Sequence, residues 1–141
     1  MELVIDASVL FTGLIGTGIT KDIIFSNVVK LYAPEYLFEE FEEHKSGVKE
    51  LSGLSLKELD LLFKKLKARI TFVPRGGFDT FLKEANELVS DKDDTEYVAL
   101  SLSMNKLPIW SNDQHFKEQS VVEVFMTPEL VKHLKSAGHT F

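Results

Sequence analysis

Glu2-Leu3-Val4-Ile5-Asp6 joins a short apolar run directly to a carboxylate. Consecutive branched apolar residues are typical of a strand that is buried on both faces of a parallel sheet. We therefore predict that residues 3–5 form the central strand. A carboxylate at the end of such a strand must be paired, bound to a metal or solvated in a cleft, because burying it alone is costly. Asp6 is thus the first candidate for a functional site.

Strand and helix patterns alternate along the rest of the chain. Further strands are predicted at 30–33, 70–73, 107–110 and 121–125. Helices are predicted at 21–29, 34–45, 55–66, 78–89, 91–104 and 127–138, with a loop at 12–20 and a turn between helices over 46–53. This order predicts an α/β fold, a three-layer α/β/α sandwich around a central mostly parallel sheet, in one domain over residues 1–141.

Length and composition agree with a single globular domain. The chain has 141 residues, of which 44% are hydrophobic and 27% charged, far from disordered or fibrous compositions. The sequence contains no cysteine, which excludes disulfides, zinc–thiolate sites and cysteine nucleophiles. The apolar run at 3–5 is too short for a signal peptide or a membrane span. We expect a cytoplasmic protein with no membrane association.

The net charge of −6 argues against broad, nonspecific attraction to nucleic acid. Carboxylates that hold divalent cations would nevertheless be neutralised locally, and the bound metal could itself contact a phosphate. Exposed helix positions are the usual place for lysine, so a solvated helix face is the commoner explanation of a basic stretch, and a groove for a polyanion is the alternative. The densest basic stretch contains Lys64, Lys65, Lys67, Arg69 and Arg75.

Three further acids accompany Asp6 near the predicted strand ends, namely Glu40, Asp94 and Asp113. The carboxyl ends of parallel strands share one edge of the sheet, so acids placed there can meet although they are distant in sequence. Asp94 and Asp113 each have an alternative role as a helix cap. Neighbouring acids also compete for the site, and they are Asp91, Asp93, Glu39, Glu42 and Glu43.

A cluster of carboxylates predicts a site for a hard divalent cation. Oxygen ligands suit Mg²⁺ or Mn²⁺, which keep several waters and combine one or two carboxylates with substrate phosphate oxygens. Such a metal can activate a water and stabilise charge on a phosphate, so that no protein nucleophile is required. The predicted chemistry is hydrolysis of a phosphodiester.

Four short motifs in order resemble the PIN-domain nucleases, including the VapC type. They are Val4-Ile5-Asp6-Ala7-Ser8-Val9-Leu10, Leu37-Phe38-Glu39-Glu40-Phe41, Asp94-Thr95-Glu96-Tyr97-Val98-Ala99-Leu100-Ser101-Leu102 and Trp110-Ser111-Asn112-Asp113-Gln114-His115-Phe116. The resemblance implies that the catalytic, metal-binding residues are Asp6, Glu40, Asp94 and Asp113, and that the supporting residues are Ser8, Asn112 and Asp93. It also implies an endoribonuclease that depends on Mg²⁺ or Mn²⁺ and cleaves single-stranded RNA.

The same resemblance suggests partners and a biological role. It implies a homodimer, and either the toxin of a toxin–antitoxin pair, with an antitoxin protein as partner, or an enzyme of RNA processing or decay. A non-catalytic PIN-like module for RNA or protein binding is the alternative, although such a module would be expected to lose metal ligands, and all four are present.

Two other classes of acidic α/β protein fit the sequence poorly. A haloacid-dehalogenase-type phosphatase needs a second aspartate two residues after the first, and Ser8 occupies that position. A response-regulator receiver needs an aspartate after the third strand and a lysine after the fifth. Pro74-Arg75-Gly76 and Thr127-Pro128 supply neither.

Overall fold

β1 (Glu2–Ile5) lies at the centre of a parallel sheet, flanked by β2 (Lys30–Pro34) and β4 (Ile109–Trp110). The computed structural model describes residues 1–16 and 18–141. Within these residues the sheet has five strands in the order β3-β2-β1-β4-β5, and all of its pairs are parallel. The outer strands are β3 (Ile70–Val73) and β5 (Val124–Phe125). The predicted central strand and α/β fold are confirmed.

The chain changes direction across the sheet at β1. From β1 it passes to β2 and β3 on one side, and then crosses to β4 and β5 on the other. In open α/β sheets such a switch point leaves a crevice outside the carboxyl ends of the strands. Val4 pairs with Ile109, and Ile5 pairs with Trp110, so the residues that follow β1 and β4 leave the sheet side by side.

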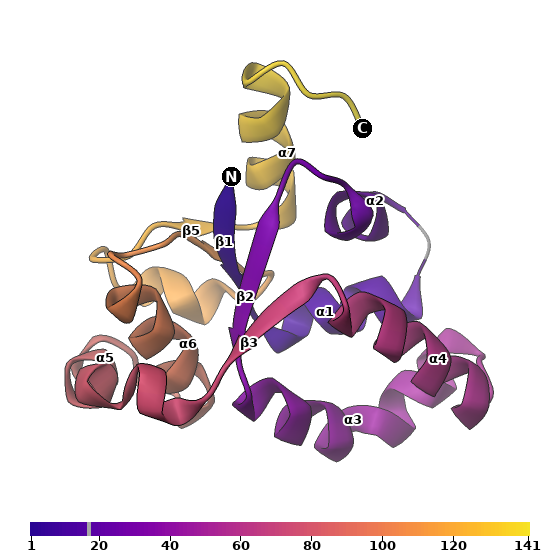
Figure 1. Ribbon diagram of the computed structural model, residues 1–141, viewed down its shortest axis with the longest axis horizontal. Coiled ribbons are helices and arrows are strands. Elements are labelled where there is room, and N and C mark those ends of the chain that lie inside the picture. The colour runs from indigo at the N-terminus through magenta and orange to yellow at the C-terminus, as the bar shows by residue number, and fades with distance from the viewer. Residues whose placement is uncertain (17) are drawn as a thin grey trace.

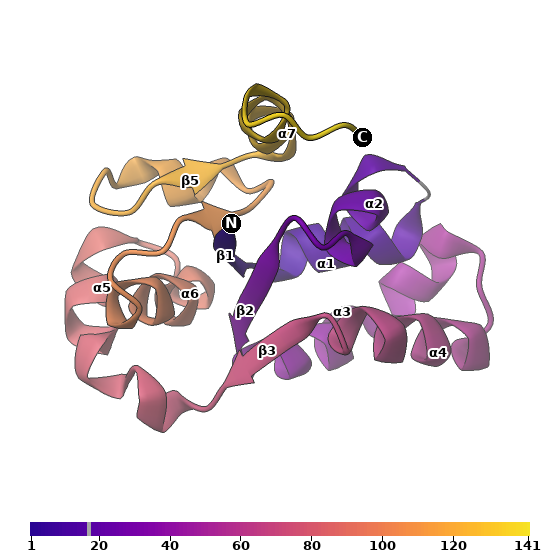
Figure 2. The same cartoon turned by 45° about the horizontal axis from the view of Figure 1, so that its top comes forward.

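Helices cover both faces of the sheet. Figures 1 and 2 show α5 and α6 on one side of the strands and α1, α3 and α4 on the other. The described residues contain α1 (Ala7–Ile15), α2 (Ile19–Phe25), α3 (Tyr36–Ser52), α4 (Leu56–Lys67), α5 (Leu82–Leu88), α6 (Lys92–Ser103) and α7 (Thr127–Ser136). Short 3₁₀ turns lie at η1 (Arg75–Gly77), η2 (Asp79–Phe81) and η3 (Gln114–Glu118). This arrangement is the predicted three-layer sandwich.

Local signals set several helix ends as predicted. Ser55 and Glu58 form the capping box of α4, with each side chain accepting from the backbone N–H of the other residue at 3.1 and 3.2 Å. Gly53 ends α3 in the left-handed conformation, with φ of 71°, which a glycine adopts without strain. The rings of Phe41 and Phe63 then stack at 3.8 Å between centroids and join α3 to α4.

The loop predicted at 12–20 is wrong over most of its length. α1 continues to Ile15 because Leu10 and Leu14 are buried at helical spacing, and α2 already begins at Ile19. Gly13 belongs to this helix, where an added Cβ would lie 3.3 Å from the Ile24 side chain. Thr17, also in the predicted loop, lies outside the described residues. Gly13 therefore allows close helix packing and does not mark a loop, whereas Gly16 and Gly18 lie in the short connection between α1 and α2.

Other predicted boundaries also need correction. α3 runs without a break through 46–47, because Phe41 and Val48 remain on one buried face and their burial outweighs the cost of a helical glycine. α2 ends at Phe25, four residues early, and α5 begins only at Leu82, after two 3₁₀ turns. β4 and β5 are two-residue strands, shorter than the predicted runs.

No single helix within residues 1–16 and 18–141 has the length and apolar character needed to cross a membrane. Helices α1 and α2 meet these two requirements only when they are taken together, as a bent pair.

Candidate metal centre

Asp6 ends β1, begins α1 and is 5% exposed. Its Oδ1 accepts hydrogen bonds from the Ser8 hydroxyl at 2.7 Å and from the Val9 N–H at 3.3 Å, and its Oδ2 accepts from the Ser111 hydroxyl at 2.8 Å. Burial raises the pKa of Asp6 to about 6, although the hydrogen bonds from Ser8 and Ser111 favour the charged form. The negative charge of Asp113 raises this pKa further. Asp6 is therefore held in one orientation next to a second acid.

The loop after β4 is tied to the first turn of α1. The Asn112 N–H donates to the Ser8 hydroxyl oxygen at 3.2 Å. The Asn112 side-chain oxygen accepts from the N–H and the hydroxyl of Thr127, at 3.3 and 2.8 Å. Ser8 and Asn112, two of the three predicted supporting residues, thus connect α1, the loop after β4 and α7. They fix the loop that carries the next acid.

Asp113 follows this loop with a side chain that is 34% exposed. Its N–H donates to the Ser111 hydroxyl oxygen at 2.9 Å, so a single serine contacts both Asp6 and Asp113. Asp113 Oδ1 also accepts from the His115 N–H at 2.9 Å, which makes Asp113 the cap of η3. The cap role and a role in the site are therefore compatible.

Asp94 lies in the first turn of α6 and is 5% exposed. Asp91, not Asp94, caps this helix, because its side chain accepts from the Asp93 N–H at 2.9 Å. The Asp94 Oδ2 atom is buried and has no hydrogen-bond partner within residues 1–16 and 18–141. Burial raises the pKa of Asp94 to about 7, and the negative charges of Asp113, Asp91 and Asp6 add to this shift. Asp93 is exposed, so Asp94 is the acid of this pair that faces the interior.

Glu40 is the half-buried acid of its helix. The neighbouring glutamates on α3, residues 39, 42 and 43, are exposed. Glu40 Oε1 accepts a hydrogen bond from the Tyr97 hydroxyl at 2.6 Å. Burial raises the pKa of Glu40 to about 7; the Tyr97 hydrogen bond opposes the shift, and the charges of Asp6 and Asp93 add to it. The structure thus places Glu40, and not its neighbours, toward Asp6.

Two tyrosines connect α3 and α6 in a reciprocal way. Tyr97 on α6 donates to Glu40 on α3, and Tyr36 on α3 donates to Asp93 on α6, also at 2.6 Å. The two rings meet edge to face, 6.5 Å apart. Burial and the neighbouring carboxylates raise the pKa of both hydroxyls, so both remain donors. The pair fixes the distance between the two helices that carry Glu40 and Asp94.

Sequence reasoning did not identify Tyr97 and Ser111 as residues of the site. Tyr97 lies in an apolar helical pattern, and only the rule that a buried phenol needs a partner could have singled it out. Ser111 follows the strand next to β1 and therefore emerges beside Asp6. The position of Ser111 directly after a predicted strand could have indicated its role, but only if the order of the strands in the sheet had been known.

The acids suit a hydrated divalent cation better than a fully protein-bound one. No group of three or more His, Cys, Asp or Glu side chains within the described part of the chain is arranged to hold a metal ion. Mg²⁺ does not require such a group, because it keeps several waters and uses one or two carboxylates. Asp6, Asp94 and Asp113 influence one another electrostatically, and Glu40 is coupled to Asp6. The unpartnered Asp94 oxygen and the oxygen-only donor set fit Mg²⁺ or Mn²⁺.

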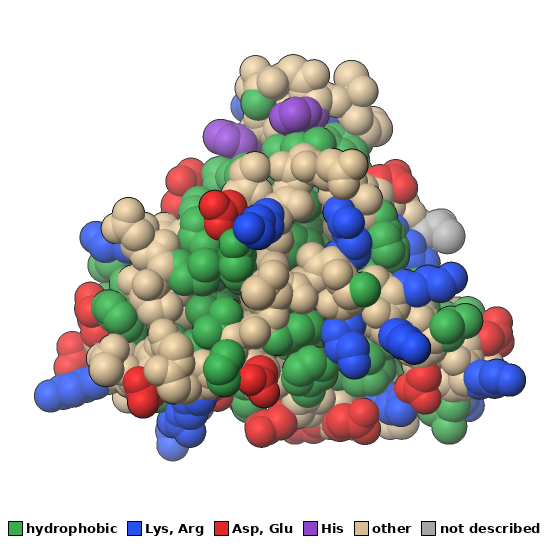
Figure 3. Space-filling model, in the orientation of Figure 1, with side chains coloured by type: hydrophobic (Ala, Val, Ile, Leu, Met, Phe, Trp, Pro, Cys, Tyr) green, Lys and Arg blue, Asp and Glu red, His purple; other side chains and the backbone are tan. Residues whose placement is uncertain are grey.

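The predicted basic stretch does not form one continuous groove. Arg69 donates to the backbone oxygens of Ile24 and Ser26, at 3.2 and 2.6 Å, and is therefore structural. Lys67 lies over the rings of Phe38 and Phe63. Figure 3 shows basic side chains scattered over this face, whereas acidic side chains gather at the rim where α3 follows β2.

Comparisons with known proteins agree with the fold. A profile described as "PIN domain" matches residues 4–134. No curated protein matches the chain significantly. Among solved structures, the chain is similar to a chain in the crystal structure of VapBC2 from Rickettsia felis bound to a DNA fragment from their promoter. The TM-score is 0.63, the sequence identity is 9%, and the match covers 89% of this chain and 98% of that one.

The low identity to the Rickettsia chain means that this likeness shows the fold alone. The profile match is the stronger result, because it covers most of the chain, from β1 into α7, and this range contains Asp6, Glu40, Asp94 and Asp113. The chain therefore belongs to the PIN domain family.

Proposed function

We propose that this protein is an endoribonuclease that depends on Mg²⁺ or Mn²⁺ and cleaves phosphodiester bonds of single-stranded RNA. The observation that carries the proposal is a set of coupled acids with raised pKa values at the switch point of the sheet. Among them, Asp94 has a buried oxygen without a partner in the described residues. Perturbed carboxylates at such a position are typical of functional sites.

Asp6 and Asp94 would hold the metal, assisted by Glu40 and Asp113. When bound, Mg²⁺ or Mn²⁺ supplies positive charge that activates water and stabilises the charge on the phosphate. Ser8 and Ser111 orient the two oxygens of Asp6. Glu40, whose pKa is about 7, is suited to accept a proton near neutral pH, and Tyr97 fixes its carboxylate for that role.

The partner proposals follow from the family and from its solved relative. We propose a toxin of a toxin–antitoxin pair, acting in the cytoplasm as a homodimer and bound by an antitoxin protein. The similarity to a chain of a VapBC2 complex supports this role at the level of the fold. RNA processing or decay is the other role that the same chemistry would serve.

Cleavage of labelled single-stranded RNA tests the proposal. Wild-type protein is expected to cut RNA with Mn²⁺ or Mg²⁺ and not with EDTA. Asp6→Asn, Asp94→Asn and Asp113→Asn should each lower the rate by about 100-fold or more, as expected for loss of about 3 kcal/mol of transition-state stabilisation. Asp22→Asn, an exposed acid on α2, should cleave like wild type. Cleavage that survives in the site variants would refute the proposed centre.

One observation favours the second candidate, a non-catalytic RNA-binding or protein-interaction module. The described residues contain no group of three acids or histidines that is already arranged around a metal position. Such a module would bind RNA or a protein partner without cutting RNA, with or without metal. RNA binding by wild type, together with no cleavage of any RNA tested in Mn²⁺, would favour this alternative.

A further inference from the structure

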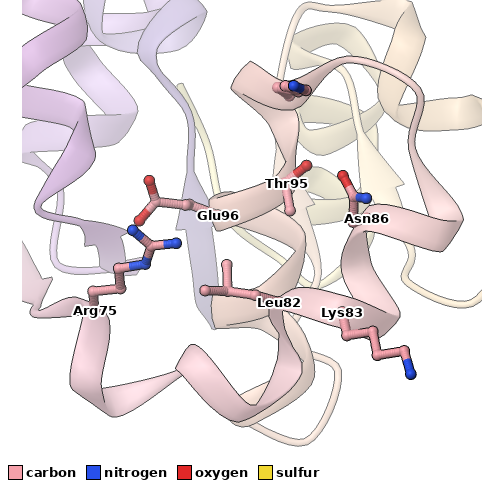
Figure 4. A pocket seen from close by; sticks show the side chains of 7 residues that line it. Arg75, Leu82, Lys83, Asn86, Thr95 and Glu96 are labelled. Atoms are coloured by element: carbon pink, nitrogen blue, oxygen red, sulfur yellow. The ribbon is translucent and has the colours of Figure 1, made fainter.

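A cleft of about 370 Å³ lies beside the acids, where η1, α5 and α6 meet (Figure 4). Its wall is unusually rich in side chains that donate hydrogen bonds. The lining residues are Arg75, Leu82, Lys83, Asn86, Lys92, Thr95 and Glu96. A hollow of this composition accommodates an anionic, oxygen-rich group.

The cations of the cleft form no close ion pair in the described residues, although the positive charge of Arg75 opposes the rise in the pKa of Glu96 that burial causes. Arg75, Lys83 and Lys92 are exposed, and within residues 1–16 and 18–141 their side chains form no ion pair within 4.0 Å and no hydrogen bond. Other lysines of the chain, such as Lys45, are paired with acids. Three cations therefore line the cleft against a single carboxylate, Glu96, in a chain whose net charge is −6.

Uncharged donors complete the wall. Thr95 is 9% exposed, and its buried hydroxyl has no hydrogen-bond partner in the described residues. A buried hydroxyl without a partner costs free energy that an added acceptor would recover. Figure 4 shows the Thr95 side chain on α6 next to Asn86 on α5, while Arg75 extends toward Glu96 on the other side of the cleft. Asn86 thus offers an uncharged donor to the cleft, and the Thr95 hydroxyl lies buried in the cleft wall.

The cleft and the acids share one turn of helix. Lys92, Thr95 and Glu96 lie within two residues of Asp94 on α6, and at this spacing their side chains project from the helix in other directions than Asp94. Arg75 and Glu96 also border a second hollow of about 450 Å³, which includes Tyr36, the donor to Asp93. This second hollow leads from the cleft to Tyr36, whose hydroxyl contacts Asp93, the neighbour of Asp94 in the sequence.

We propose that this cleft binds a backbone phosphate of the RNA strand, adjacent in the strand to the phosphate that is cleaved. The inference rests on the proposed function and assigns that function a substrate subsite. Phosphate oxygens accept from arginine, lysine, hydroxyl and amide groups, and such contacts position a strand without reading its sequence. The cleft thus sets the register of the RNA over the acids and gives no base preference.

Binding of a short labelled single-stranded RNA, followed by fluorescence anisotropy in EDTA over a salt series, tests this subsite. Arg75→Gln and Lys83→Gln should each weaken binding by about 3- to 10-fold and reduce the slope of log affinity against log salt by roughly 0.7, the value for one lost phosphate contact on a single strand. Lys57→Gln removes the same charge from an exposed position on α4 and should change neither quantity.

Thr95 provides a test that is independent of charge. Thr95→Val should weaken RNA binding without changing the salt slope and without lowering the melting temperature, because the hydroxyl has no partner within the described protein. Thr95→Ser, which keeps the hydroxyl, should restore the affinity. A lower melting temperature together with wild-type RNA affinity in Thr95→Val would show that the hydroxyl is only structural.

The outcomes separate the subsite from the nuclease. If wild type cleaves RNA while Arg75→Gln and Lys83→Gln keep wild-type affinity and slope, the subsite is wrong and the nuclease proposal stands. If wild type binds RNA through the cleft but never cleaves it, the nuclease proposal fails, and the cleft is a phosphate site of a non-catalytic RNA-binding module. Binding of polyglutamate by wild type as tightly as RNA would overturn the assignment of the cleft to phosphate.

Discussion

Replacing Asp94 by asparagine should stabilise the metal-free protein at pH 8. The folded state raises the pKa of Asp94 from 3.8 to about 7, mainly through burial, so the charged carboxylate opposes folding. Asparagine resembles the protonated acid in shape and carries no charge. The substitution therefore removes a destabilising charge, even though it is expected to weaken metal binding strongly.

The size of the effect follows from the pKa shift. At about 1.4 kcal/mol per pKa unit, a rise from 3.8 to about 7 corresponds to about 4 kcal/mol of lost stability when the pH is high enough for Asp94 to be charged in the folded protein. The coupled acids Asp6 and Asp113 share part of this cost, and the buried amide still lacks partners, so we expect a net gain of about 2 kcal/mol in Asp94→Asn. Because the folded protein binds the proton more tightly than the unfolded chain, this gain is small below pH 4 and grows as the pH rises to about 7.

Urea unfolding in EDTA measures this effect directly. The free energy of unfolding of Asp94→Asn should exceed that of wild type at pH 8, and the difference should be clearly smaller at pH 5. Asp22→Asn makes the same chemical change at an exposed position on α2 and should alter stability by no more than about 0.5 kcal/mol. A variant that is less stable than wild type at pH 8, or a difference that is independent of pH, would refute the reasoning.

Three further outcomes follow from the same geometry. Adding Mg²⁺ should raise the melting temperature of wild type but not of Asp6→Asn, because a ligand that binds only the folded state stabilises it, and differential scanning calorimetry measures this. Ser111→Ala should lower the free energy of unfolding, measured by urea denaturation, by about 1–3 kcal/mol, because it removes a donor to Asp6 and an acceptor for the Asp113 N–H. Ser136→Ala, at the surface, should have little effect. Tyr97→Phe should raise the pKa of Glu40 in an NMR titration, because the hydrogen bond that is lost favours the charged carboxylate. Tyr32→Phe, as the control, should leave the pKa of Glu40 unchanged. A lower pKa of Glu40 in Tyr97→Phe would contradict the assigned contact.

The sheet was predictable because its signals are local. Buried strands appear as short runs of branched apolar residues, as in 3–5, and the order of strands and helices then determines which carboxyl ends share an edge. The wrong predictions concerned loops and turns that were placed at glycine and serine residues. Gly13 and Gly47 suggested breaks, but both lie inside helices whose apolar faces continue past them. The periodicity of burial outweighed the residues that usually mark turns.

The site was only partly predictable, for a physical reason. The acids were found from their positions after strands or at a helix start, and burial in the folded chain distinguishes Glu40 and Asp94 from their exposed neighbours. The groups that orient them are remote in sequence. Tyr97 is 57 positions from Glu40, and Ser111 is 105 positions from Asp6. Such contacts depend on strand order and helix packing, which no local pattern specifies.

A calorimetric titration with Mn²⁺ at pH 6.5, in two buffers with different ionisation enthalpies, tests the metal centre most directly. Asp94 and Glu40, with pKa values of about 7, are partly protonated there, and metal ligands must lose their protons. Wild type should bind Mn²⁺ with release of protons, and Asp94→Asn should bind far more weakly. Binding of equal strength in Asp94→Asn, or binding by wild type without proton release, would contradict the assignment of these acids to a metal site.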